Sequence, residues 1–128
     1  MDINISEEKI IEIVDWAAYH YGKRLEGLVF FDPSTVDHDY PRAEINLLLV
    51  LNGVSDQARD RYQSLSDGVL SVIFGDRQTI QCRIQTPEEI QSLLELQMPL
   101  LRIYLQDSFI AYDPGQLLTK IHADLTSA

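Results

Sequence analysis

Apolar residues in the first part of the chain recur at helical spacing. Ser6 is a preferred N-cap residue, Glu7–Glu8 places negative charge in the first turn, and Gly22 is a typical helix end. The apolar positions between them share one predicted helix face: Ile10, Ile13, Val14, Ala17, Ala18 and Tyr21. Three further rings on this helix are expected to pack at the core edge or form an interface rather than bind a cofactor: Trp16, Tyr19 and His20.

Two apolar runs that follow predict strands. The first is Leu25–Phe31, which is short and bounded by Gly22 and Asp32-Pro33. The second is Ala43–Leu51, which is long and apolar enough for a central strand covered on both faces. A turn at Asn52-Gly53 ends it.

The next segment changes from period 3.6 to period two. A helix capped by Ser55 or Asp56 is expected to end near Gly75. Its predicted apolar face consists of Ala58, Tyr62, Leu65, Val69, Val72 and Ile73. Thr79–Gln85 then alternates apolar and polar residues, which predicts a strand with one wetter face and places Cys82 in the core.

The last part of the chain predicts three short helices and one strand. Thr86–Glu89 is a capping box with proline at the first helical position. Pro99 is expected to start a separate helical piece, Phe109–Tyr112 to form a short strand, and Asp113-Pro114-Gly115 to lead into a terminal helix. The order of elements predicts an α/β (α+β) domain with a mixed sheet of three or four strands flanked by helices.

Composition narrows the class of protein. The chain has 128 residues with 45% apolar content, which favours one domain spanning residues 1–128. We expect a soluble, unprocessed cytoplasmic protein, because no signal or membrane-spanning pattern is present and Cys82 has no partner cysteine. A net charge of -10 argues against binding to nucleic acid or to anionic membranes.

The order of elements, closed by Phe109-Ile110-Ala111-Tyr112-Asp113, resembles the minimal nucleotidyltransferases of the polymerase-beta-like superfamily. The resemblance covers nearly the whole chain. In that family the first strand ends in Gly-Ser, a second strand carries Asp-x-Asp, and a third carboxylate lies early in the next strand. The matching nucleotide-binding positions here are Asp32, Pro33 and Ser34, and the matching catalytic positions are Glu44, Asn46 and Gln81. The spacing survives, whereas the polar residues differ.

These substitutions weaken the chemistry that the resemblance implies. Such enzymes hold two magnesium ions between carboxylates, and amides at Asn46 and Gln81 would leave Glu44 as the one acid of the set. Asp32 and Pro33 form a good helix start, in which the acid side chain takes the amides that a phosphate would need. We therefore expect a degenerate site without a cofactor.

Two other interpretations use nearby residues. The loop Asp37-His38-Asp39 with Glu44 could bind a metal ion, but these are ordinary turn residues without a spaced histidine pair, and we assign no metal site. An active enzyme would hold one magnesium ion through Glu44 with Asp32, Asp37 or Asp39. A small-molecule binding domain that reuses the cleft is a third class. Four arginines are expected at the surface, with Arg83 facing the cleft: Arg42, Arg59, Arg61 and Arg83.

The leading hypothesis is therefore a catalytically degenerate domain that acts through binding. Its partner would be a second copy or a helical protein. Minimal nucleotidyltransferases are often paired with helical-bundle proteins of the HEPN family as antitoxin and toxin, so the resemblance implies an antitoxin-like pseudoenzyme. An acidic module would also suit a basic partner.

Overall fold

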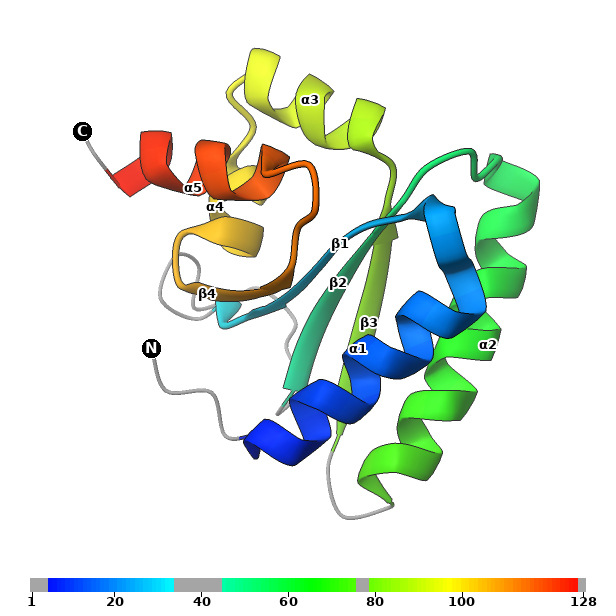
Figure 1. Cartoon of the computed structure of the whole chain (residues 1–128). Helices are drawn as coiled ribbons and strands as arrows, with labels where there is room; N and C mark the ends of the chain where they lie inside the picture. Colours follow the sequence, from blue (N-terminus) through cyan, green and yellow to red (C-terminus); the bar gives the residue numbers. More distant parts are fainter. Residues whose placement is uncertain (1–4, 34–44, 76–78, 127–128) are drawn as a thin grey trace.

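The computed structural model describes residues 5–33, 45–75 and 79–126 of the chain. Within these ranges the chain forms five α-helices, one 3-10 turn and a four-stranded mixed sheet (Figure 1). In chain order the elements are α1 (Glu7–Tyr21), η1 (Gly22–Arg24), β1 (Leu25–Phe31), β2 (Ile45–Leu51), α2 (Asp56–Phe74), β3 (Ile80–Gln85), α3 (Pro87–Glu95), α4 (Pro99–Leu105), β4 (Ser108–Tyr112) and α5 (Leu117–Thr126). The predicted mixed α+β fold is confirmed.

The sheet has the order β3-β2-β1-β4. β1 pairs antiparallel with both β2 and β4, whereas β2 and β3 run parallel. The parallel pair is joined by α2, the usual crossover helix between parallel strands. As a result, the C-terminal end of β1 and the N-terminal ends of β2 and β3 lie at one edge of the sheet.

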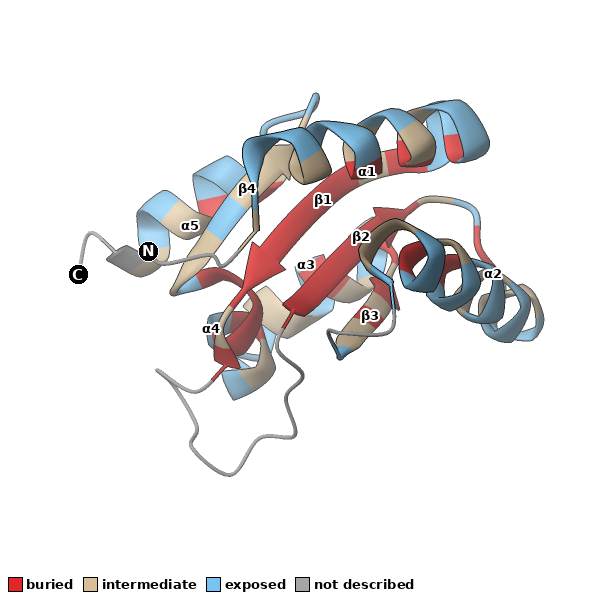
Figure 2. Ribbon diagram, turned by 90° about the horizontal axis from the view of Figure 1, so that it is seen from below, coloured by how far each residue is buried: buried red, intermediate tan, exposed pale blue. Residues whose placement is uncertain are grey.

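The sheet separates two apolar cores. On one face, α1 and α2 pack over side chains that include Leu47 and Leu49. On the other face, α3, α4 and α5 pack over Leu48 and Val50. Figure 2 shows β2 buried along its whole length between these layers. The apolar run Leu47–Leu51 of this strand is explained, because both of its faces are covered.

Local capping explains where the helices begin. The Ser6 hydroxyl accepts a hydrogen bond from the Lys9 N–H at 3.3 Å, and Ser55 accepts one from Ala58 at 3.2 Å. Thr86 and Glu89 form the predicted capping box. Gly22 ends α1 with φ at 56°, and the chain then makes the 3-10 turn, which the sequence pattern did not predict.

The predicted buried face of α2 is partly wrong. Leu65 is 39% exposed and Val72 is 83% exposed, whereas Ser66 and Leu70 are fully buried. Ser66 can be buried because its hydroxyl lies 2.6 Å from the Tyr21 hydroxyl in α1, and this hydrogen bond satisfies both groups. Because the sequence pattern counts serine as polar, the predicted buried face of α2 is shifted by about one residue from the observed one.

None of the helices in the described ranges is both long enough and apolar enough to cross a membrane.

Candidate functional site

The positions matched to the nucleotidyltransferase motifs gather at one edge of the sheet. β1 ends at Phe31 and is followed by Asp32-Pro33. Asn46 is the second residue of β2, and Gln81 is the second residue of β3. The antiparallel pairing of β1 with β2 and the parallel pairing of β2 with β3 bring these three places together.

Asn46 and Gln81 are direct register partners on neighbouring strands. Neighbouring strands lie about 4.8 Å apart and paired residues point to the same face, so the two amides are neighbours. Asn46 alternates with Ile45 and Leu47 of the α1–α2 core and therefore faces the α3–α5 layer. It is 5% exposed, and Gln81 is half-buried. These two positions hold neutral oxygens where the family motif has carboxylates.

The end of β1 is tied into the fold through its backbone. The Asp32 N–H donates to the carbonyl oxygen of Asp107, between α4 and β4, at 3.1 Å. Pro33 is buried and has no N–H. Two consecutive positions therefore present no backbone donor for a phosphate.

The remaining predicted site residues lie outside the described part of the chain. Ser34 and Glu44 belong to residues 34–44, as does the loop Asp37-His38-Asp39, so neither the acid-capped helix start nor that loop is described. Within the described ranges, no three histidine, cysteine or acidic side chains are grouped so that they could hold a metal ion.

A polar stripe continues from Gln81 along β3. Arg83 and Gln85 alternate with buried Cys82 and Ile84, so they share the sheet face of Gln81. The Gln85 amide donates to the hydroxyl of Tyr104 in α4 at 3.3 Å. This stripe gives the site hydrogen-bonding groups rather than a cluster of acids.

The outer edge of β3 is covered by side chains of α2. Arg59 Nη1 donates to the Ile84 carbonyl oxygen at 3.4 Å, and the Gln63 amide donates to the Cys82 carbonyl oxygen. Arg59 Nη2 also lies 2.8 Å from Glu89 Oε1 at the start of α3. The prediction that Arg59 is merely a solvated surface charge is wrong, since its role depends on contacts with β3 and α3 that only the fold brings together.

Burial and hydrogen bonding set the protonation of three groups near this region. Burial raises the pKa of the Cys82 thiol far above its usual range, so Cys82 is an inert core residue rather than a nucleophile. Burial tends to raise the pKa of Glu89, but hydrogen bonds from Arg59 and the Thr86 backbone outweigh it, and the net pKa is lowered. The hydrogen bond to Glu89 in turn raises the pKa of Arg59.

The described groups that could bind a ligand are the side-chain amides on β2 and β3, the guanidinium of Arg83 and the buried hydroxyl of Tyr104. They include no activated nucleophile and no cluster of carboxylates. The family resemblance singled out Asn46 and Gln81, and Arg83 was the arginine expected to face the same cleft. Sequence reasoning missed Tyr104, because the contact between α4 and β3 joins segments whose relative placement the pattern does not specify. Comparisons with protein-family models, with curated proteins and with solved structures found no match to this chain.

Proposed function

We propose that this protein is a catalytically degenerate nucleotidyltransferase-like domain that acts by binding another protein chain. The observation that carries the proposal is the register pairing of Asn46 with Gln81 at the edge of the sheet where β1 ends. The strand order brings together the places that the family resemblance assigns to its motifs. Two of the three places assigned to metal ligands carry amides.

Electrostatics explains why amides argue against nucleotidyl transfer. Two adjacent magnesium ions and a triphosphate need several carboxylates to balance the metal charge. Asn46 and Gln81 offer oxygen lone pairs without charge. Backbone donors are also missing at Asp32, whose N–H bonds to Asp107, and at Pro33. The binding of metal ions and the binding of phosphate are therefore both weakened.

A protein partner agrees with the surface of the molecule. Several large apolar side chains are exposed on or at the end of helices, among them Tyr19 at 92%, Val72 at 83% and Leu96 at 71%. The net charge of -10 would favour a basic partner and speed its association. The family resemblance adds a helical-bundle protein of the HEPN type, or a second copy, as the class of partner.

Calorimetric titration with ATP and magnesium tests the catalytic half of the proposal. We expect no binding in the micromolar range, and no transfer of labelled nucleotide to any protein. Magnesium-dependent micromolar affinity, or labelled product, would instead support an active enzyme that holds magnesium through Glu44 and neighbouring acids.

A further inference from the structure

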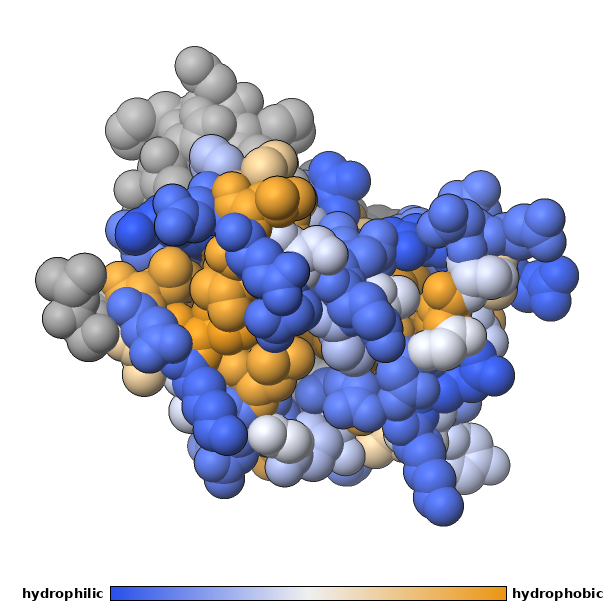
Figure 3. Space-filling model, turned by 90° about the horizontal axis from the view of Figure 1, so that it is seen from above, coloured by the Kyte–Doolittle hydropathy of each residue, from blue (hydrophilic) through white to orange (hydrophobic). Residues whose placement is uncertain are grey.

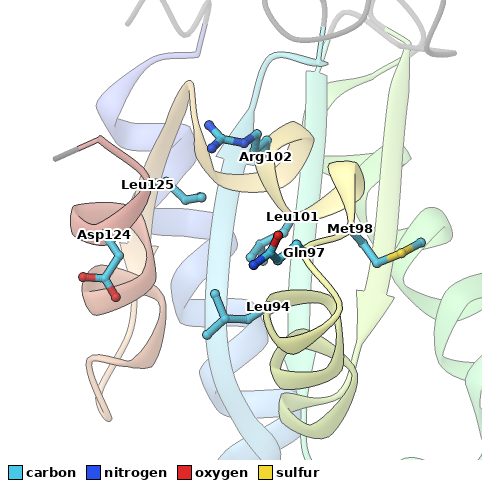
Figure 4. Close-up of a pocket in the computed structure, with 7 residues that line it drawn as sticks. All are labelled: Leu94, Gln97, Met98, Leu101, Arg102, Asp124 and Leu125. Carbon is cyan, nitrogen blue, oxygen red and sulfur yellow. The ribbon is translucent and has the colours of Figure 1, made fainter. Parts of the chain in front are cut away.

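A groove lies between α3, α4 and α5. Its volume is about 450 Å³. Four apolar side chains line it: Leu94, Met98, Leu101 and Leu125. Figure 4 shows Asp124 and Leu125 of α5 on one side, and residues of α3, α4 and the turn between them on the other. In the view from above, apolar surface gathers in a hollow between hydrophilic ridges (Figure 3).

The turn between α3 and α4 holds one groove residue in an unusual conformation. Gln97 has φ at 53°, in the left-handed region that glycine normally occupies after a helix. The Gln97 N–H donates to the Leu94 carbonyl at 3.1 Å, and the Met98 N–H donates to the Leu93 carbonyl at 2.9 Å, which is a Schellman ending. A glutamine here costs backbone energy that a glycine would not, yet it places a polar side chain at the groove.

The exposed walls of the groove favour a helix over a small molecule as its ligand. Small ligands usually lose most of their surface to the protein. Here Gln97, Arg102 and Asp124 are exposed, and Met98 is 44% exposed, so the walls are wet. An amphipathic helix needs to bury only its apolar face, and such grooves accept side chains spaced at i, i+3 or i+4, and i+7. Methionine suits this role because its side chain adapts to the shape of the helix.

The charge of this protein indicates which kind of partner helix the groove would bind. Apart from Glu89, which is paired with Arg59, the helices α3, α4 and α5 carry three acidic side chains, Glu88, Glu95 and Asp124, against two basic ones, Arg102 and Lys120. Each copy of the chain has a net charge of -10, which opposes close approach of a second copy and attracts a cationic segment. A basic partner is therefore favoured over self-association at this groove.

We propose that the groove between α3, α4 and α5 binds a basic amphipathic helix of a partner protein. This inference rests on the proposed binding function and names its surface and the chemistry of its partner. It does not depend on whether the sheet edge retains nucleotide chemistry.

The test uses the full chain labelled with ¹⁵N and a synthetic helix of about five turns, with leucines on one face and lysines on the other. We expect amide shifts confined to the groove, at Leu94, Met98, Leu101 and Leu125. A peptide with glutamate in place of lysine should bind at least about tenfold more weakly, since its charge repels the domain. A peptide of the same composition whose leucines do not share a face should leave the groove signals unchanged.

Matched variants test the location. Met98→Lys places a positive charge in the groove and should weaken binding about tenfold, whereas Val72→Lys on α2 makes the same charge change elsewhere and should weaken it less than about twofold. Thermal midpoints check that both variants fold. If Met98→Lys does not fold, the shift map of the unchanged protein decides.

Three results would overturn the inference. They are shifts away from the groove, equal binding of the acidic or shuffled peptide, and a concentration-dependent dimer that the basic peptide dissociates by occupying the groove. Magnesium-dependent ATP binding would contradict the proposed degenerate function while leaving a positive peptide map intact. If the peptide caused no amide shifts and ATP did not bind, the groove would be ruled out as the binding site, while the proposed degenerate function would still hold.

Discussion

At the scale of single residues, Arg59 and Glu89 join three elements. The Glu89 carboxylate accepts the Thr86 backbone N–H at 2.8 Å within the capping box, and it also accepts Arg59 from α2. Arg59 reaches on to the Ile84 carbonyl at the end of β3. The capping box could be predicted from Thr86 and Glu89, because its partners are three residues apart. The arginine could not, because it comes from 30 residues away.

Glu89→Gln is expected to lower stability at neutral pH and to flatten its acid dependence. The folded pKa of Glu89 is lowered, so its contribution is present above the ordinary glutamate pKa of about 4.3 and is lost as pH falls through the folded value. Because Glu89 is 37% exposed in its side chain, water screens the pair and the loss is no more than about 1 kcal/mol. Urea unfolding at pH 7 and pH 3 measures the difference.

Exposed Glu88, on the same turn, supplies the control for this prediction. Glu88→Gln removes the same charge next to the same helix end without removing an acceptor of Arg59. It should change the unfolding free energy less than Glu89→Gln at pH 7. Equal losses in the two variants would mean that the helix dipole, rather than the contact with Arg59, accounts for the effect.

At the scale of elements, β1 and α5 approach closely at Gly27. The register of β1 against β2 shifts between Leu25 and Gly27, which marks a bulge. A Cβ added at Gly27 would lie 2.5 Å from Leu118 Cδ1 and 3.3 Å from Val50 Cγ2. The strand itself could be predicted from its apolar run. The close approach at Gly27 could not, because Leu118 belongs to α5, the last helix of the described chain.

Gly27→Ala should therefore destabilise the fold, by about 1 to 3 kcal/mol, as overpacking of a filled core does. Combining it with Leu118→Val should cost less than the sum of the two single changes, because the contacting atom is drawn back. Chemical unfolding of the single and double variants gives the coupling energy.

Gly68 offers the matched control. It lies in α2, where an added Cβ meets nothing within 4 Å, so Gly68→Ala should stabilise the protein by about 0.5 to 1 kcal/mol through helix propensity. If Gly27→Ala were also neutral or stabilising, Leu118 would have to move aside at little cost, and the close packing of α5 on β1 would be contradicted.

At the scale of the whole molecule, sequence periodicity predicted the elements better than their arrangement. A central strand was expected because Ala43–Leu51 is long and apolar enough to be covered on both faces, and β2 (Ile45–Leu51) is buried throughout. Its pairing with β3 in parallel and with β1 in antiparallel depends on long-range packing that the alternation of residues does not encode. The juxtaposition of Asn46 with Gln81 was inferred from the family resemblance, and the strand register agrees with it.

That register makes a carboxylate cluster costly to rebuild. Asn46 is 5% exposed, so a buried aspartate there would lose hydration, and a second aspartate at Gln81 would lie on the neighbouring strand about 4.8 Å away. Like charges at this separation raise each other's pKa. A natural enzyme compensates such repulsion with metal ions, whereas this chain has neutral side chains at both places.

The restoration of the family motif is therefore an experiment on the entire domain. In one variant, Pro33→Ser restores a backbone N–H and Asp32→Gly removes the acid side chain beside it, while Glu44→Asp, Asn46→Asp and Gln81→Asp rebuild three acids. Without metal we expect this variant to be less stable than the unchanged chain by about 2 to 4 kcal/mol at pH 7. The difference should be smaller at pH 5, since unpaired buried carboxylates are penalised until they protonate.

Magnesium and ATP should then return part of that stability, because a ligand that binds only the folded state stabilises it by about 2.7 kcal/mol at a hundredfold excess over its dissociation constant. Thermal midpoints with magnesium, with ATP and with both measure the recovery, and Asn46→Asp alone, which lacks the cluster, should recover little. A fivefold variant that folds but gains no stability from magnesium with ATP would mean that the sheet edge has changed shape as well as ligands. The catalytic geometry would then be lost from the scaffold itself, since restoring the side chains on β2 and β3 would not restore the site.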